Sequence, residues 1–136
     1  LHETTDSDET EFRPALAARD GKPFEPGEIQ DGFYLVDDID RPQPDFQRAV
    51  IDAVARVTHI AEPDAHGQII ESPVQSPGVI AFPVSRWNLC AAITGARFTT
   101  TTEVYPDSPR TTPAQCNLAQ VVAIRAAMDH ALAAAP

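Results

Sequence analysis

Residues 32–61 read GFYLVDDIDRPQPDFQRAVIDAVARVTHIA, and this stretch decides the fold class. Its first part, 32–39, is a short apolar run that ends in acids, which predicts a strand. Two prolines within 41–45 forbid both helix and strand there. From Asp45 onward, apolar residues recur at helical spacing, so we expect Asp45 to be the N-cap of an amphipathic helix over 45–61.

The rest of the chain adds strands and a second helix. Residues 67–74 and 78–85 look like two strands joined by a proline-containing turn, and 89–106 is rich in β-forming residues. Thr112 then caps a last amphipathic helix over 113–134, with proline at its first position. We expect an α+β fold, in which an antiparallel sheet of four to five strands carries both helices in a two-layer sandwich.

The 136 residues divide into a tail and one domain. Residues 1–31 are acidic, contain proline and lack a hydrophobic period, which predicts a largely disordered tail or tether. Residues 32–136 form the single globular domain. The chain begins at Leu1, so either a leader has been removed or the sequence was trimmed.

The charge balance excludes some partners. The formal net charge is −10 and the only lysine is Lys22, so no basic surface is available for nucleic acid. No apolar stretch of about 18 residues is present, so we expect no transmembrane segment.

The two cysteines, Cys90 and Cys116, have three interpretations. A metal site needs further ligands at tight spacing, and no histidine lies between them. A catalytic cysteine needs a base, which His59, His66 or His130 could supply, but no signature surrounds either thiol. We therefore predict a disulfide between Cys90 and Cys116, with two unrelated free thiols as the alternative. A disulfide implies an oxidising compartment.

Residues 59–67 gather two histidines and two acids just past the first helix. His59, Glu62, Asp64 and His66 could form a zinc or general-base site, but their spacing matches no metal motif. We interpret them as polar residues of a surface loop.

Residues 37–45 contain four aspartates, Asp37, Asp38, Asp40 and Asp45. Their oxygens could hold Ca²⁺, but the glycine and glutamate of an EF-hand loop are missing. We interpret the segment as a solvated turn, and we predict no metal site and no cofactor.

Hydrolase and phosphate-binding signatures are absent, so the sequence identifies no catalytic residue. Arg86, Trp87, Arg97 and Tyr105 are the candidate binding residues, because tryptophan and arginine are typical of interfaces. A lone tryptophan is more often part of a core, so this prediction depends on Trp87 being exposed.

An acidic amino-terminal segment, an Ala- and Pro-rich composition and two cysteines resemble small exported proteins and lipoproteins of actinobacteria. The resemblance assigns no role to any residue, and it implies an extracellular or envelope-attached protein with a possible lipid anchor before residue 1. The favoured hypothesis is an exported, non-catalytic domain that binds a protein or small molecule outside the cell. The alternatives are a small cell-envelope hydrolase with a non-local site and a carrier of a small hydrophobic ligand.

Overall fold

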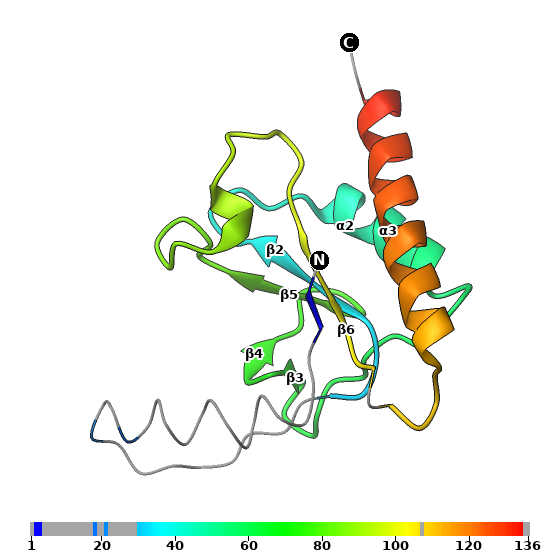
Figure 1. Cartoon of the computed structure of the whole chain (residues 1–136). Coiled ribbons are helices and arrows are strands. Elements are labelled where there is room, and N and C mark those ends of the chain that lie inside the picture. The colour runs from blue at the N-terminus through cyan, green and yellow to red at the C-terminus, as the bar shows by residue number, and fades with distance from the viewer. Residues whose placement is uncertain (1, 4–17, 19–20, 22–29, 107, 135–136) are drawn as a thin grey trace.

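The computed structural model describes residues 2–3, 18, 21, 30–106 and 108–134, so most of the predicted tail lies outside the described residues. The described part is α+β, as the sequence predicts. Helices α2 (Pro44–Val54) and α3 (Pro113–Ala133) pack against each other and against a small mixed sheet (Figure 1). None of the helices described is long and apolar enough to cross a membrane.

The sheet runs in the order β6 (Thr101–Val104), β2 (Tyr34–Asp38), β5 (Val79–Phe82), with the two-residue strand β1 (His2–Glu3) beside β6. β2 is antiparallel to β6 but parallel to β5. The predicted antiparallel sheet of four to five strands is therefore not confirmed. The reason is the helix α2 between β2 and β5, because a helical crossover returns the chain in its original direction.

β2 is buried on both faces, which explains its nearly continuous apolar run. Leu35 belongs to an apolar cluster shared with α2 and α3. Tyr34 and Val36 belong to a second cluster, shared with a hairpin of β3 (Gln68–Ile69) and β4 (Ser72–Pro73). This hairpin adds a small third layer to the expected two-layer sandwich.

The amino-terminal end of α2 differs slightly from the prediction. Gln43 is the N-cap in place of Asp45, and its side chain makes no capping hydrogen bond. Asp45 lies in the first turn, where a carboxylate favours the positive end of the helix dipole, and it pairs with Arg48 at 2.9 Å.

The carboxyl end of α2 comes earlier than predicted, at Val54 instead of Ala61. Residues 59–61 pair with Phe33 at the start of β2. The Phe33 N–H donates to the carbonyl of His59 at 3.1 Å, and the Ala61 N–H donates to the carbonyl of Phe33 at 2.9 Å. These backbone bonds to the sheet replace the bonds of the predicted last helical turns.

The strands after α2 are shorter than predicted. Residues 67–74 split into β3 and β4, because Ile70 and Glu71 have positive φ angles of 44° and 63° that turn the chain. Of residues 89–106, only β6 is a strand, and it follows the short 3₁₀ helix η2 (Cys90–Ala92).

Two later elements agree with the sequence. β5 lies within the predicted 78–85, and α3 falls within the predicted 113–134. The Thr112 hydroxyl caps α3 by accepting the N–H of Gln115 at 3.3 Å. The buried face of α3 consists of small residues, namely Cys116, Ala119 and Ala123.

Candidate binding groove

A groove follows the outer edge of β5, between this strand and α2. It consists of three adjoining hollows of 270, 300 and 470 Å³, of which the first two border α2 and the third continues past the loop before β5 to residues 59–63. Ser76, on the loop before β5, lines all three hollows and is exposed. The three hollows therefore form one continuous surface feature with Ser76 at its centre.

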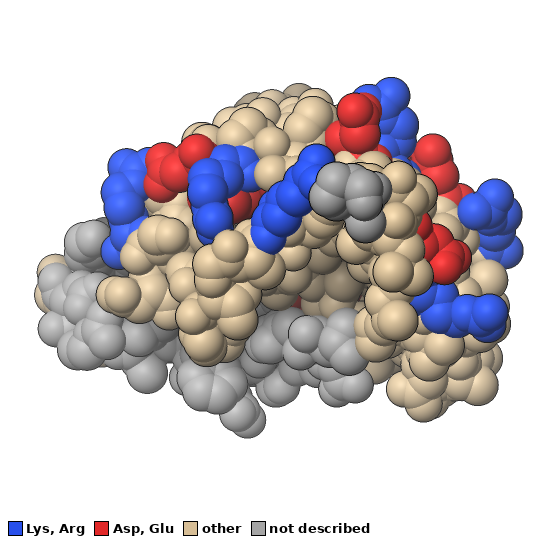
Figure 2. All heavy atoms as spheres, turned by 90° about the horizontal axis from the view of Figure 1, so that it is seen from above, with Lys and Arg blue, Asp and Glu red and all other residues tan. Residues whose placement is uncertain are grey.

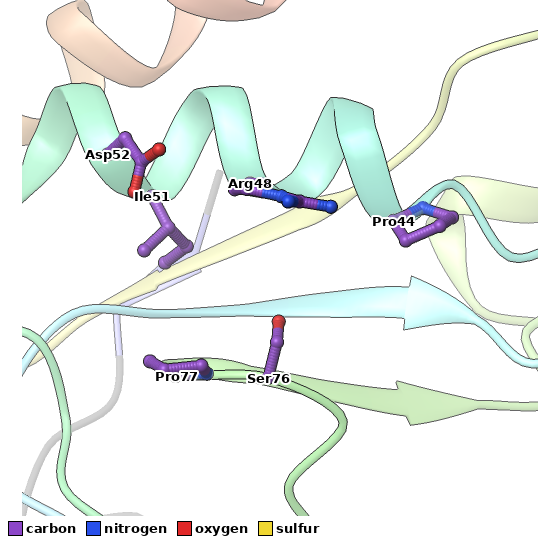
Figure 3. A pocket seen from close by; sticks show the side chains of 6 residues that line it. All are labelled: Pro44, Arg48, Ile51, Asp52, Ser76 and Pro77. Atoms are coloured by element: carbon purple, nitrogen blue, oxygen red, sulfur yellow. The ribbon is translucent and has the colours of Figure 1, made fainter.

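The middle hollow lies directly between α2 and the loop before β5. Figure 3 shows Arg48, Ile51 and Asp52 extending from the helix, with Ser76 and Pro77 opposite them on the loop. Ile51 is buried and supplies an apolar floor, whereas Arg48 and Asp52 are exposed. The rim of this hollow thus carries one positive and one negative side chain.

β5 is an edge strand within the described chain, and its outward backbone groups border the groove. The loop before β5 already binds the outward backbone groups of Val79. The Val79 N–H donates to the Ser76 carbonyl at 2.9 Å, and the Gln75 N–H donates to the Val79 carbonyl at 2.8 Å. By the alternation of the ladder, the backbone of Ala81 also faces outward, and Ala81 lines the first hollow.

One end of the groove contains a cluster of polar side chains around His59, which lines the third hollow with Arg110. His59 Nε2 lies 2.8 Å from Asp31 Oδ1 and 3.5 Å from Ser108 Oγ. Burial acts to raise the pKa of the Asp31 carboxyl. Hydrogen bonds from Ser108 and His59 and the nearby positive charges of His59 and Arg110 outweigh burial, so this pKa is lowered.

The Asp31–His59–Ser108 cluster is not arranged as a nucleophilic site. In a serine–histidine–aspartate relay, the hydroxyl and the carboxylate bind different nitrogens of the imidazole. Here Asp31 and Ser108 both lie against Nε2, so that nitrogen is not available to the serine as a base. Ser108 is also buried, and its Oγ accepts the N–H of Arg110 at 3.0 Å. The cluster therefore holds three chain segments together.

The other residues of the predicted His59 site do not lie together. Glu62 lines the third hollow, but His66 is exposed in the following turn. Asp64 Oδ1 closes this turn by accepting the N–H groups of His66 and Gln68, both at 2.8 Å. These residues form a surface turn, with no shared site for a metal ion.

An exposed tryptophan lies beyond the carboxyl end of β5, on the side of the sheet that carries the β3–β4 hairpin. Trp87 is 56% exposed and rests on Phe82, with ring centroids 5.0 Å apart. Ile39 is also half-exposed, lines the first hollow, and donates its N–H to the Phe82 carbonyl at 3.0 Å. We call Phe82 and Trp87 the Trp87 patch. Arg86 pairs with Asp40 at 3.2 Å at the border of this patch.

The four predicted binding residues do not form one surface. Arg86 and Trp87 are adjacent, but Arg97 donates to the carbonyl of Ala134 at 3.0 Å, at the end of α3. The Tyr105 carbonyl accepts the N–H of Ser108, which places Tyr105 at the His59 end. Arg97 and Tyr105 are separated because they lie before and after β6, at opposite ends of that strand.

The four aspartates of 37–45 do not converge either. The buried Asp37 carboxylate accepts the Gln47 side-chain amide at 2.8 Å, and Asp38 accepts Arg41 at 3.2 Å. Across residues 30–106 and 108–134, no group of three His, Cys, Asp or Glu side chains could hold a metal ion.

Cys90 and Cys116 are free thiols in the structure, and the predicted disulfide between them is not formed in it. Cys90 is exposed in η2, whereas Cys116 is buried, with its Sγ 4.0 Å from Thr111 Oγ1. Figure 1 shows the physical reason, because η2 and the first turn of α3 lie on opposite sides of the molecule.

Sequence reasoning missed Ser76 and Gln47. Ser76 matters only because α2 and the loop before β5 approach each other, and no local pattern signals this. Gln47 is buried on the apolar face of α2, where its amide donates to Asp37 and to the carbonyl of Thr99. A glutamine among apolar positions of a helix is the signal that could have identified it.

Comparison of the chain with models of known protein families finds no match, and no curated protein is recognisably similar in sequence. The geometry of the groove and its two ends is therefore the basis for the function proposed below.

Proposed function

We propose that this protein is a non-catalytic binding domain that holds an extended segment of a partner protein in the groove between α2 and β5. The observation that carries the proposal is the set of three hollows that meet at Ser76 along a sheet edge. Sheet edges and the grooves beside them are common sites for extended peptides, because the peptide backbone meets the outward groups of the strand.

The length of the groove suits a short extended segment. α2 has 11 residues, so the groove beside it runs for about 16 Å. An extended chain advances about 3.3 Å per residue, and about five residues would therefore cover this distance.

The surface chemistry supports a partner of mixed polarity. The floor includes buried Ile51 and Val79, and the rim includes Arg48 and Asp52. Figure 2 shows basic and acidic side chains interspersed on one face, with no large area of a single sign. The Trp87 patch lies past the carboxyl end of β5 and would anchor an apolar side chain of a partner segment that extends beyond the groove, since tryptophan often dominates binding energy at interfaces.

A binding role without catalysis fits the His59 cluster. The cluster does not support a hydrolase that uses Ser108 as its nucleophile, because Asp31 already binds Nε2, the imidazole nitrogen that lies nearest the Ser108 hydroxyl. A carrier of hydrophobic ligands would need an enclosed apolar cavity, whereas these hollows lie at the sheet edge and open to solvent.

We also propose that the partner lies outside the cell or in the cell envelope. The support for this location is the acidic amino-terminal segment and the composition of the sequence. The cysteines give it no support, since both are free in the structure.

The test is selection of displayed random peptides of about 12 residues on the immobilised full chain, followed by measurement of each enriched peptide against variants. Ser76→Trp places a large side chain at the junction of the three hollows, and we expect it to weaken binding at least about 10-fold. Ala65→Trp is the matched control, because Ala65 is exposed in a turn outside the groove.

Enriched peptides that bind Ser76→Trp as tightly as the unchanged chain would overturn the proposal. So would a selection that enriches no peptide. Trp87→Ala adds a second readout, because peptides with an apolar anchor should lose affinity for it while other groove peptides should not.

A further inference from the structure

The first hollow of the groove lies where α2 begins and where β2 and β5 end. Its volume is 270 Å³, and its walls include Asp37 of β2, Gln47 of α2 and Ala81 of β5. Figure 3 shows Pro44, in the first turn of α2, above the arrowheads of these two strands. Asp37 and Ala81 are paired across the strands, so their side chains lie next to each other on the same face of the sheet. Because Ala81 has only a methyl group, space remains beside the Asp37 carboxylate.

Asp37 differs from the other aspartates of 37–45 in having no arginine partner among the residues described. The other aspartates each form an ion pair, Asp38 with Arg41, Asp40 with Arg86 and Asp45 with Arg48. Asp37 is only 5% exposed. A buried carboxylate that no cation accompanies is costly, so this hollow favours a positively charged group.

The hydrogen bonds of the Asp37 carboxylate leave one acceptor position open. Oδ1 accepts the N–H of Asp38 at 2.9 Å and the side-chain amide of Gln47 at 2.8 Å. Within the described chain, Oδ2 accepts a single bond, from the N–H of Gln43 at 3.0 Å. Since a carboxylate offers about four acceptor positions, Oδ2 can accept one more donor. The donors already present are neutral and leave the negative charge of Asp37 in place.

Gln47 supplies a second acceptor in the same wall. It is 1% exposed, and its Nε2 donates to Asp37 Oδ1 and, at 3.1 Å, to the carbonyl of Thr99. The amide cannot be reversed, because Oε1 would then lie against two other oxygens. Oε1 is buried and has no hydrogen-bond partner in the described chain. A buried acceptor without a partner is rare and costly, so Gln47 points to a donor from outside the chain.

The mouth of the hollow suits an aliphatic stem. Ile39, Pro42 and Pro44 line it and are exposed. A lysine side chain commonly lays its stem along such apolar surface, and its compact ammonium has enough N–H donors for both Asp37 Oδ2 and Gln47 Oε1. Arginine fits less well, because its planar guanidinium prefers both oxygens of one carboxylate, and Asp37 Oδ1 already accepts two bonds.

We propose that the first hollow is a pocket for an alkylammonium group, which binds between Asp37 and Gln47. In the groove this group is a lysine side chain of the bound segment, a step that rests on the function proposed above. The pocket itself does not depend on a peptide, because a free amine carries the same chemistry.

Titration of the isotope-labelled full chain with Nα-acetyl-lysine methylamide tests the pocket by nuclear magnetic resonance. The side-chain amide signal of Gln47 is the reporter, and Gln47→Met identifies this signal by removing it. We expect a saturable shift with a Kd of about 1 mM, as is typical of a ligand of this size. Nα-acetyl-norleucine methylamide has the stem without the ammonium, and it should bind at least about 10-fold more weakly.

Two variants test the acceptor side of the contact. Asp37→Asn removes the charge and should weaken binding of the lysine probe at least about 10-fold. Asp52→Asn is the matched control, because Asp52 is an exposed carboxylate that lines the middle hollow. Circular dichroism checks that both variants remain folded.

A third variant fills the pocket and leaves its acceptors unchanged. Ala81→Leu occupies the space beside Asp37 and should abolish binding of the lysine probe, so the proposal remains testable even if Asp37→Asn does not fold. Ala65→Leu is the matched control, because Ala65 is exposed in a turn outside the groove.

Equal binding of the lysine and norleucine probes would overturn the proposal, and so would equal effects of Asp37→Asn and Asp52→Asn. The absence of a saturable shift up to about 20 mM probe would also overturn it. If groove peptides are enriched but the lysine probe does not bind, the groove stands and the pocket is wrong. If the probe binds but no peptide is enriched, the pocket stands, and its ligand is a free amine in place of a lysine side chain.

Discussion

α2 and α3 pack side by side on the same sheet, yet they distribute their apolar residues differently. α2 buries large side chains such as Phe46 and Ile51 and exposes charged ones such as Arg48 and Asp52. α3 buries small residues and exposes large apolar ones. The difference shows that α2 directs its large apolar side chains into the core, as a typical surface helix does, whereas α3 leaves its largest apolar side chains in solvent.

The largest expected effect is on α2. Phe46 is buried and packs against Phe98 and His130, with ring centroids 5.2 and 5.5 Å apart. Phe46→Ala should lower the free energy of unfolding by about 3–5 kcal/mol, because it leaves a cavity between the helices.

Leu118→Ala on the exposed side of α3 is the matched change. It should change the free energy of unfolding by less than about 0.5 kcal/mol, because Leu118 is 46% exposed. Urea unfolding of both variants measures the difference. Similar losses at the two positions would mean that Leu118 is packed in the folded chain, and the contrast between the helices would be lost.

Cysteine reactivity tests the inner face of α3. Cys116 lies on that face and is buried, while Cys90 is exposed. We expect iodoacetamide to modify Cys90 rapidly in the native protein and Cys116 about 100-fold more slowly, since Cys116 must wait for local or global unfolding. Peptide mapping by mass spectrometry measures the two rates.

Urea should remove the difference between the two cysteines. Equal native rates would show that α3 is not packed on its inner face. If neither thiol reacts before reduction, the two cysteines are bridged in solution, and the disulfide predicted from the sequence would replace the free thiols of the structure.

The sequence predicts those parts of the fold that local patterns determine. The apolar period of α2 identifies its inner face, and Thr112 followed by proline identifies the start of α3. The parallel direction of β5 could not be predicted, because it depends on how the α2 crossover returns the chain. The predicted end of α2 was wrong because residues 59–61 form backbone hydrogen bonds with Phe33, which is distant from them in the sequence.

The candidate sites were less predictable than the fold. Trp87 and Arg86 were identified by residue type alone, and both are exposed just past the carboxyl end of β5. Arg97 and Tyr105 were predicted to join them, but they lie before and after β6, and the structure separates them. The groove depends on Ser76 facing α2, and such a tertiary approach leaves no periodic pattern in the sequence.

The pH dependence of stability tests the junction between the two helices. The His59 segment follows α2 and the Ser108–Arg110 segment precedes α3, and both bind the Asp31 carboxylate. Because folding lowers the pKa of Asp31, this carboxylate stabilises the folded state above its unfolded pKa of roughly 4. That contribution is lost as the pH falls through the lower, folded pKa.

Asp31→Asn should therefore lower the free energy of unfolding at neutral pH and reduce its dependence on pH in the acidic range. Urea unfolding at a series of pH values measures both effects. Glu62→Gln is the control, because Glu62 is exposed nearby and should leave the profile unchanged. An unchanged profile for Asp31→Asn would mean that Asp31 does not hold the two segments together.

The smallest expected effect concerns the helix caps. Thr112 caps α3 through its side chain, whereas the N-cap of α2, Gln43, makes no such bond. Thr112→Ala should lower the free energy of unfolding by about 1 kcal/mol. Gln43→Ala should leave it nearly unchanged, because the bond from Gln43 to Asp37, at 3.0 Å, is made by the backbone N–H, which the substitution keeps. Urea unfolding resolves the difference when both variants are measured together. An equal loss of unfolding free energy would mean that Gln43 stabilises α2 through a side-chain contact. A loss for Thr112→Ala alone would show that α3, whose fully buried side chains are small, depends more on its local cap than α2 does.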